Sequence, residues 1–188
     1  MFKSEIRIIG WDDAAFSKDI KPQKVKLVGA IIRGGDYIDG LLATEVEYDG
    51  LNSTQKIASS VLNSRHRDQL RAIMTDGITF AGFNLVDIDD LNKQTGLPVI
   101  AVLRAKPQLE EFMAALRRYD DFEQRKKIVE SAGPIHSFGK IFFQFAGISK
   151  KEAEDIIFLS TTRGNIPEPL RVAHLIASGL SGESSGRA

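Results

Sequence analysis

The stretch Glu5-Ile-Arg-Ile-Ile-Gly-Trp-Asp-Asp13 decides the fold that this sequence predicts. Ile6 and Ile8 fall on one face of an extended chain, and β-branched side chains suit a pleated strand. Two adjacent carboxylates end the stretch. We therefore predict a first strand over residues 5–13 that carries acidic side chains at its carboxyl end.

The segments that follow predict a mixed α/β domain. Residues 24–32 and 37–47 are expected as two further strands, antiparallel through the turn Gly34-Gly35-Asp36. We then expect helices over residues 52–64, 83–94, 107–131, from 149 onward and over 168–180, with strands over 70–76, 97–103 and 140–145. Three antiparallel strands followed by alternating helices and strands is the order of a ribonuclease-H-like fold, which has helices on both faces of its sheet.

The composition is typical of one globular domain. The chain has 188 residues, of which 43% are apolar and 27% charged. We expect a single domain over residues 1–180 and a loose, Gly/Ser-rich tail over 181–188. The sequence shows no apolar run of about 18 residues and no signal-peptide pattern, so we expect no membrane span and a cytoplasmic location. Basic and acidic residues number 25 each, so net charge neither indicates nor excludes a nucleic-acid partner.

Acidic residues stand at the ends of two predicted strands: Asp12 and Asp13 end the first, and Asp76 ends the strand over residues 70–76. If these strands are neighbours, the carboxylates converge, and such a cluster repels itself unless a cation joins it. The chain lacks cysteine, so Mg²⁺ or Mn²⁺ on oxygen ligands is the expected cofactor. Adjacent strand residues point to opposite faces, so we expect only one of Asp12 and Asp13 to be a primary metal ligand beside Asp76. The alternative is that these aspartates are ordinary turn or cap residues.

Other polar residues each have two interpretations. Glu45 and Glu47 share one face of the third strand, where one could complete the metal site or both could simply be exposed. The stretch Thr161 to Arg171 combines glycine, prolines and arginines before a helix, which is typical of an anion site or of a structured helix entry. His174 lies among apolar residues of the last helix, where a histidine more often packs than binds a ligand.

Four motifs resemble an archaeal family related to endonuclease V, the endonuclease dU family, which is named for cleavage of DNA at deoxyuridine. They are Gly10-Trp-Asp-Asp13, Asp76-Gly77, Gly96-Leu-Pro-Val-Ile100 and Arg163-Gly-Asn-Ile-Pro-Glu-Pro-Leu-Arg-Val-Ala-His174. The resemblance spans about residues 5–180, and the C-terminal block is its most specific part. It implies a divalent-metal endonuclease of DNA repair that acts on deaminated, uracil-containing DNA.

Endonuclease V itself is a more distant resemblance, with departures. Tyr37-Ile-Asp-Gly-Leu-Leu-Ala43 is similar to the stretch whose loop probes the lesion in that family. The family's glutamate falls on Val46, between Glu45 and Glu47. Its lysine position holds Arg104, with Lys106 two residues on. Its Gly-His motif meets Gly164-Asn165, so we expect that histidine to be lost.

The resemblance implies roles for two sets of residues. The catalytic set is Asp12, Asp13, Asp76, Lys106 and one of Glu45 or Glu47, and the substrate-binding set is Tyr37, Arg104, Arg163, Asn165, Arg171 and His174. Asp12 and Asp76 would be the main metal ligands, Lys106 or Arg104 would contact phosphate, and Tyr37 would stack at the lesion or wedge beside it. Two alternatives stay open. One is an RNA-directed nuclease. The other is a non-catalytic nucleic-acid or protein binding module, which is supported by the departures from the endonuclease V motifs and would have separated carboxylates.

Overall fold

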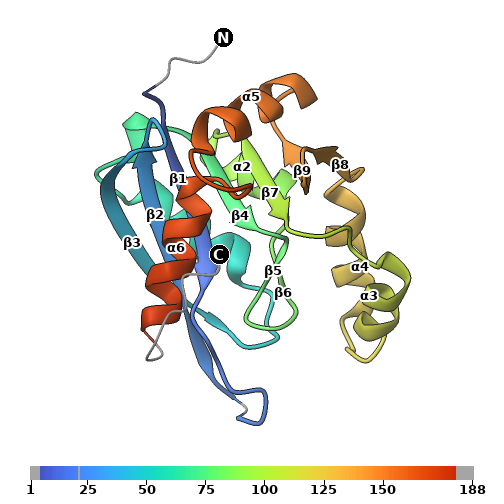
Figure 1. The fold of residues 1–188 in the computed structure, drawn as a ribbon. Helices are drawn as coiled ribbons and strands as arrows, with labels where there is room; N and C mark the ends of the chain where they lie inside the picture. Colours follow the sequence, from blue (N-terminus) through green and yellow to red (C-terminus); the bar gives the residue numbers. More distant parts are fainter. Residues whose placement is uncertain (1–4, 21, 181–188) are drawn as a thin grey trace.

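One mixed sheet organises the domain, with its strands in the order β3-β2-β1-β4-β7-β9-β8 (Figure 1). The computed structural model describes residues 5–20 and 22–180, so the predicted tail at 181–188 lies outside the described residues. The sheet strands are β1 (Arg7–Asp13), β2 (Lys24–Arg33), β3 (Tyr37–Glu47), β4 (Leu70–Asp76), β7 (Val99–Leu103), β8 (His136–Phe138) and β9 (Ile141–Ala146). A separate hairpin pairs β5 (Thr79–Phe80) with β6 (Asn84–Leu85).

Each of the first three strands runs antiparallel to its neighbour, as the sequence predicts. β1 is also parallel to β4, and β4 is parallel to β7. β9 then runs antiparallel to both β7 and β8. Because β1, β4 and β7 are parallel neighbours, their carboxyl ends meet at one edge of the sheet.

Helices cover both faces of the sheet, which confirms the predicted layering. They are α1 (Ser53–Leu62), α2 (Ile88–Thr95), α3 (Leu109–Leu116), α4 (Phe122–Ser131), α5 (Lys150–Ser160) and α6 (Glu168–Gly179), with a short 3-10 turn at Arg67–Gln69. One face packs on α1 and α2 through residues such as Ile57 and Leu91, and the other packs on α5 and α6 through Ile156 and Leu170. In the described part of the chain, no helix combines the length and apolar character that crossing a membrane requires.

The helix predicted over residues 107–131 is two helices, α3 and α4, which form a hairpin beside the sheet (Figure 1). Leu116 and Arg125 are both buried, at 0% and 2% exposed. Nine residues separate them, which at about 3.6 residues per turn places them on opposite sides of a continuous helix. Only a break lets both face the domain, where Arg125 donates to the Asp49 carbonyl oxygen at 2.7 Å.

The helix predicted over residues 83–94 starts later, at Ile88. Asp87 caps it by accepting from the backbone N–H groups of Asp89 and Asp90 at 3.1 and 3.0 Å. The residues before this cap belong to β6. A two-residue strand has no periodicity of its own, so the β5–β6 hairpin could not be recognised from the sequence pattern.

Gly10 sets the position of α6 on the sheet. A Cβ at Gly10 would lie 2.4 Å from the Pro169 carbonyl carbon and 2.7 Å from the Leu170 nitrogen, so only glycine lets these backbones approach. From Gly10 to Asp12 the chain advances two residues along β1, and from Pro169 to His174 it advances five residues along α6. Both steps cover roughly 7 Å. Asp12 and His174 are thereby brought to the same level of the fold.

We expect Gly10→Ala to lower the free energy of unfolding by about 1–3 kcal/mol, because the added methyl group meets helix backbone that cannot rotate away. The measurement is chemical denaturation. Gly179→Ala is the matched control, since nothing lies within 4 Å of a Cβ at that helical position. A Gly10→Ala protein as stable as wild type would show that α6 does not depend on this approach.

Candidate metal centre

Asp12 and Asp76 lie side by side on neighbouring parallel strands. Trp11 is in register with Thr75, so the next residue of each strand falls at the same level. Ile8 lies on the same face of β1 as Asp12, and Met74 lies on the same face of β4 as Asp76. Because Ile8 and Met74 pack against α5 and α6, both carboxylates point toward the α6 side of the sheet. The predicted convergence of the two strand ends is therefore present in the structure.

His174 reaches this pair from α6. Its Nδ1 lies 2.7 Å from Asp12 Oδ2. One ligand atom from each of Asp12, Asp76 and His174 lies within 4.8 Å of the other two. The histidine beside the carboxylates is thus His174 of α6 and not a residue near Gly164-Asn165. The sequence signal that could have found it is Gly10, because a glycine inside a strand indicates a close backbone neighbour.

Asp13 points to the other face of the sheet. Its Oδ2 accepts the backbone N–H of Ala81 at 2.5 Å, so it holds the segment after β5. Its own backbone N–H donates to Asp12 Oδ1 at 2.8 Å. Asp13 therefore supports the cluster through Asp12 and through the loop that it anchors.

Burial is the main reason why the pKa values of Asp12 and Asp13 are raised. Asp12 is only 6% exposed, and this burial, together with the nearby carboxylates of Asp76 and Asp13, raises its pKa to about 6. The hydrogen bond from His174 opposes the rise. Burial also raises the pKa of Asp13, with Asp76 adding to the effect. Negative charge in this cluster therefore lacks full compensation from the protein.

Arg104 is the cation at the rim of the cluster. Its Nη2 lies 3.0 Å from Asp76 Oδ2. Arg104 and Asp76 line an open cleft of about 330 Å³ together with Asp12, Asp13, His174 and Ser178. Lys106 is exposed two residues further along the same loop. The ion pair makes Arg104 the basic residue that the structure brings to the carboxylates.

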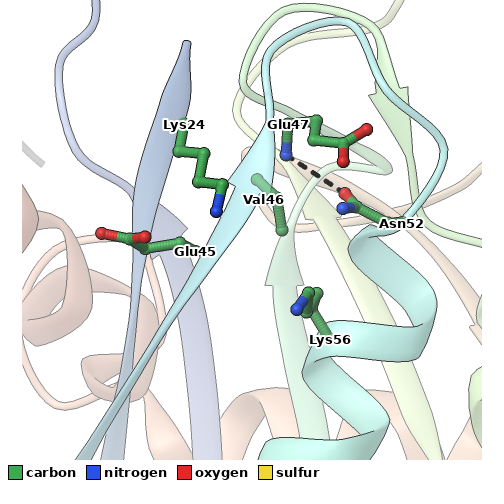
Figure 2. Close-up of a pocket in the computed structure, with 6 residues that line it drawn as sticks. All are labelled: Lys24, Glu45, Val46, Glu47, Asn52 and Lys56. Carbon is green, nitrogen blue, oxygen red and sulfur yellow. Dashed lines mark hydrogen bonds between the residues drawn. The ribbon is translucent and has the colours of Figure 1, made fainter.

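Glu45 and Glu47 do not join the cluster. They lie on β3, two strands from β1, and line a separate cavity of about 280 Å³ with Lys24, Val46, Asn52 and Lys56 (Figure 2). The Glu47 backbone N–H donates to Asn52 Oδ1 at 3.2 Å. The structure does not bring either glutamate into the cluster, because the sheet order puts β2 between them and β1, and the third group within 4.8 Å is His174.

Three predicted substrate residues lie at the opposite end of the sheet. Tyr37 pairs with Arg33, which in turn pairs with Arg7 at the start of β1. Arg163 and Asn165 belong to the loop before α6, and a Cβ at Gly35 would approach Thr162 of that loop to 2.9 Å. The antiparallel β2–β3 hairpin and the entry to α6 thus place these three residues away from the carboxylates, and their substrate-binding roles stay a prediction.

Arg171 is already engaged by its own helix. Its guanidinium contacts both carboxylate oxygens of Glu168, with the shortest distance 2.6 Å. Glu168 is 6% exposed, so the pair anchors the first turn of α6. This arrangement favours the helix-entry interpretation of the stretch Thr161 to Arg171 over an anion site.

Comparisons with known proteins agree with this architecture. The family model described as Endonuclease dU matches residues 4–181. A protein of Methanosarcina acetivorans named "UPF0215 protein" is 50% identical over 193 residues, covering 99% of this chain and 96% of the relative. The crystal structure of a protein of unknown function from Archaeoglobus fulgidus aligns with TM-score 0.88 at 44% identity, covering 94% of this chain and 98% of the other.

A more distant solved structure shows the type of fold. Ciona intestinalis Endonuclease V, solved in complex with a 24mer DNA containing an inosine followed by a ribo-adenosine, aligns with TM-score 0.58 at 14% identity. The alignment covers 90% of this chain and 83% of that chain. The predicted ribonuclease-H-like fold is thereby confirmed.

The raised pKa of Asp12 predicts a pH-dependent cost in the metal-free protein. Because the folded-state pKa is about 6 and the ordinary value is 3.8, the folded state holds the proton more tightly, and stability falls as pH rises between these values. In EDTA, Asp12→Asn should gain stability relative to wild type by on the order of 1–3 kcal/mol between pH 4 and pH 7. Denaturant unfolding at both pH values measures this change, and a constant difference would contradict it.

Proposed function

The chain belongs to the endonuclease dU family, and from that membership we propose that it is a divalent-metal-dependent endonuclease acting on deaminated, uracil-containing DNA. The observation that carries the proposal is the cluster of Asp12, Asp76 and His174, whose ligand atoms lie within 4.8 Å of one another. The proposal places the protein in DNA repair.

The residues of the cluster fit Mg²⁺ or Mn²⁺. Asp12 and Asp76 offer carboxylate oxygens, which both ions prefer, and His174 offers imidazole nitrogen. The fit also has an electrostatic basis, because Asp76 raises the pKa of the buried Asp12 and a cation would offset that repulsion. When bound, such an ion would activate water and stabilise the leaving oxygen in phosphodiester hydrolysis.

The protein's own groups have distinct tasks in this proposal. Asp12 and Asp76 would hold the metal with His174 in reach as a third ligand, and the 2.7 Å contact between His174 and Asp12 would orient the Asp12 carboxylate. Arg104, now on Asp76, would turn to a phosphate of the substrate, where it offers charge-assisted hydrogen bonds. Asp13 would keep the neighbouring loop in place through Ala81. Lys106 stays a second candidate for phosphate contact.

The alternative of a non-catalytic binding module has less support. That alternative predicts separated carboxylates, whereas Asp12 and Asp76 lie together with a histidine. DNA is proposed before RNA because of the family's described substrate, and an RNA arm in the cleavage experiment separates the two.

Metal binding should be visible without any catalysis. We expect Mn²⁺ to raise the melting temperature of the wild-type protein, since a ligand at one hundred times its Kd stabilises by about 2.7 kcal/mol. Asp12→Asn and Asp76→Asn should lose this shift. Glu45→Gln, which removes a carboxylate from the separate cavity, should keep it. A shift that survives both aspartate substitutions would place the ion elsewhere.

Strand cleavage tests the activity itself. With Mg²⁺ or Mn²⁺, wild type should cut labelled DNA containing one uracil, while matched cytosine DNA should stay intact. Asp12→Asn and Asp76→Asn should each slow cutting by about a hundredfold or more, since removing even a supporting residue of a metal site costs about 10–100-fold. Glu45→Gln serves as the folded control.

Three outcomes would contradict the proposal. No metal-dependent cutting by wild type would remove the nuclease function. Equal cutting by wild type and both aspartate variants would remove the site assignment. Cutting of a matched RNA in preference to uracil-containing DNA would replace the substrate.

A further inference from the structure

A continuous chain of hydrogen bonds runs from the α3–α4 hairpin to the candidate metal centre. It begins at Arg125 of α4, whose Nη2 donates to the Asp49 carbonyl oxygen at 2.7 Å. The backbone N–H of Asp49 donates to the Ala81 carbonyl oxygen at 2.9 Å, and the N–H of Ala81 donates to Asp13 Oδ2 at 2.5 Å. The N–H of Asp13 then donates to Asp12 Oδ1 at 2.8 Å. We call these five residues the relay.

Arg125 anchors the relay from inside the protein, where it is only 2% exposed. Its guanidinium also donates to the carbonyl oxygens of Gly50 and Phe83, and it pairs with Asp121 at 2.5 Å. The planar guanidinium offers several donors in fixed directions, so one side chain joins the turn after β3 to the segment between β5 and β6. A buried charge is costly unless its donors are satisfied, and here backbone carbonyl groups satisfy them.

The two central residues of the relay have strained backbones. Among residues 5–20 and 22–180, only Asp49 and Ala81 combine a side chain with a positive φ, at +56° and +45°. Such conformations persist only where the surrounding structure holds them, and they cluster at functional sites. Asp49 Oδ1 strengthens the hold by accepting the N–H of Phe83 at 3.0 Å. The contacts of the relay therefore maintain a geometry that the local sequence does not favour.

We infer that Arg125 is a positioning residue of the metal centre, which acts through Asp49, Ala81 and Asp13 on the carboxylate of Asp12. The inference deepens the proposed function and rests on it, because positioning matters only if Asp12 binds a metal. It also gives a function to the break between α3 and α4, which is what allows Arg125 to face the domain.

The Asp12 carboxylate is held at both of its oxygens. Oδ2 contacts His174 of α6 at 2.7 Å, and Oδ1 accepts the Asp13 N–H at the end of the relay. Without the Arg125 anchor, the contact with His174 would remain while the other oxygen loses its fixed partner. Groups that orient a metal ligand without touching the metal typically contribute about 10–100-fold to metal affinity.

The Kd for Mn²⁺, measured from the electron paramagnetic resonance signal of the unbound ion, tests the inference. Arg125→Lys keeps the charge but replaces the planar fork by a single ammonium group. This substitution should raise the Kd about tenfold, because it releases the relay from α4. Arg118→Lys makes the same change at an exposed arginine of the same hairpin and is the matched control, which should leave the Kd unchanged.

A second control separates positioning from stability. Leu116→Ala removes a fully buried side chain of α3, so it should lower the melting temperature without touching the relay. Below that temperature its Kd for Mn²⁺ should equal that of wild type. If Arg125→Lys fails to fold, Asp121→Asn loosens the same anchor by removing its counter-charge and should raise the Kd in the same direction.

A double-mutant cycle tests whether the relay is continuous. Asp13→Ala removes the acceptor of the Ala81 N–H and should raise the Kd about tenfold, whereas Asp13→Asn keeps an oxygen there and should recover part of the loss. Because Arg125→Lys and Asp13→Ala break the same relay, the combined variant should bind about as weakly as either one. Independent effects would multiply to about a hundredfold and would overturn the inference.

Amide hydrogen exchange in EDTA reports on the relay without any metal. The N–H groups of Ala81 and Asp13 should exchange faster in Arg125→Lys than in wild type or Leu116→Ala. Unchanged exchange, an unchanged Kd in the anchor variant, or an equal loss of affinity in Leu116→Ala would each overturn the inference. If wild type binds no Mn²⁺ while exchange at Asp13 still responds to Arg125→Lys, the proposed metal function fails and the relay stands.

Discussion

The backbone contact between β1 and α6 is the constraint on which the candidate site depends. Gly10 lets the Pro169 backbone come so close that a Cβ would lie 2.4 Å from its carbonyl carbon. The bidentate pair of Arg171 with Glu168 anchors the same helical turn. Because α6 is fixed at this point, its next turn delivers His174 to Asp12. The candidate metal centre therefore depends on the packing of α6 against β1 as well as on its own residues.

The cluster itself works against the stability of the fold. Two carboxylates of adjacent strands face one another, one of them almost fully buried, so burial and repulsion raise the pKa of Asp12. Arg104 and His174 offset part of this charge from the rim and from α6. A cation held between Asp12 and Asp76 would offset the part of this cost that the hydrogen bonds from His174 and from the Asp13 backbone do not.

Much of the fold followed from local pattern, whereas much of the site did not. The β2–β3 hairpin and the strands β1, β4 and β7 were predictable, because alternation, apolar runs and turn residues act over a few positions. Asp12 and Asp76 followed from strand order. The partnership with His174 spans 162 residues and depends on the angle of a helix, which no periodicity encodes. The distance of the β3 glutamates from the cluster could not be predicted, because the alternation of residues along β3 does not show which strand lies between β3 and β1.

The dipeptide Asp76-Gly77 ends β4 at the carboxylate cluster. Asp76 belongs to the face covered by α6, whereas Gly77 lines a second cavity that lies toward the hairpin of α3 and α4. Gly77 has φ +71°, a conformation that L side chains rarely adopt, and here the chain turns out of β4. The chain therefore turns away directly beyond Asp76, so the carboxylate stands at the end of the strand and lines the same open cleft as Arg104 and His174.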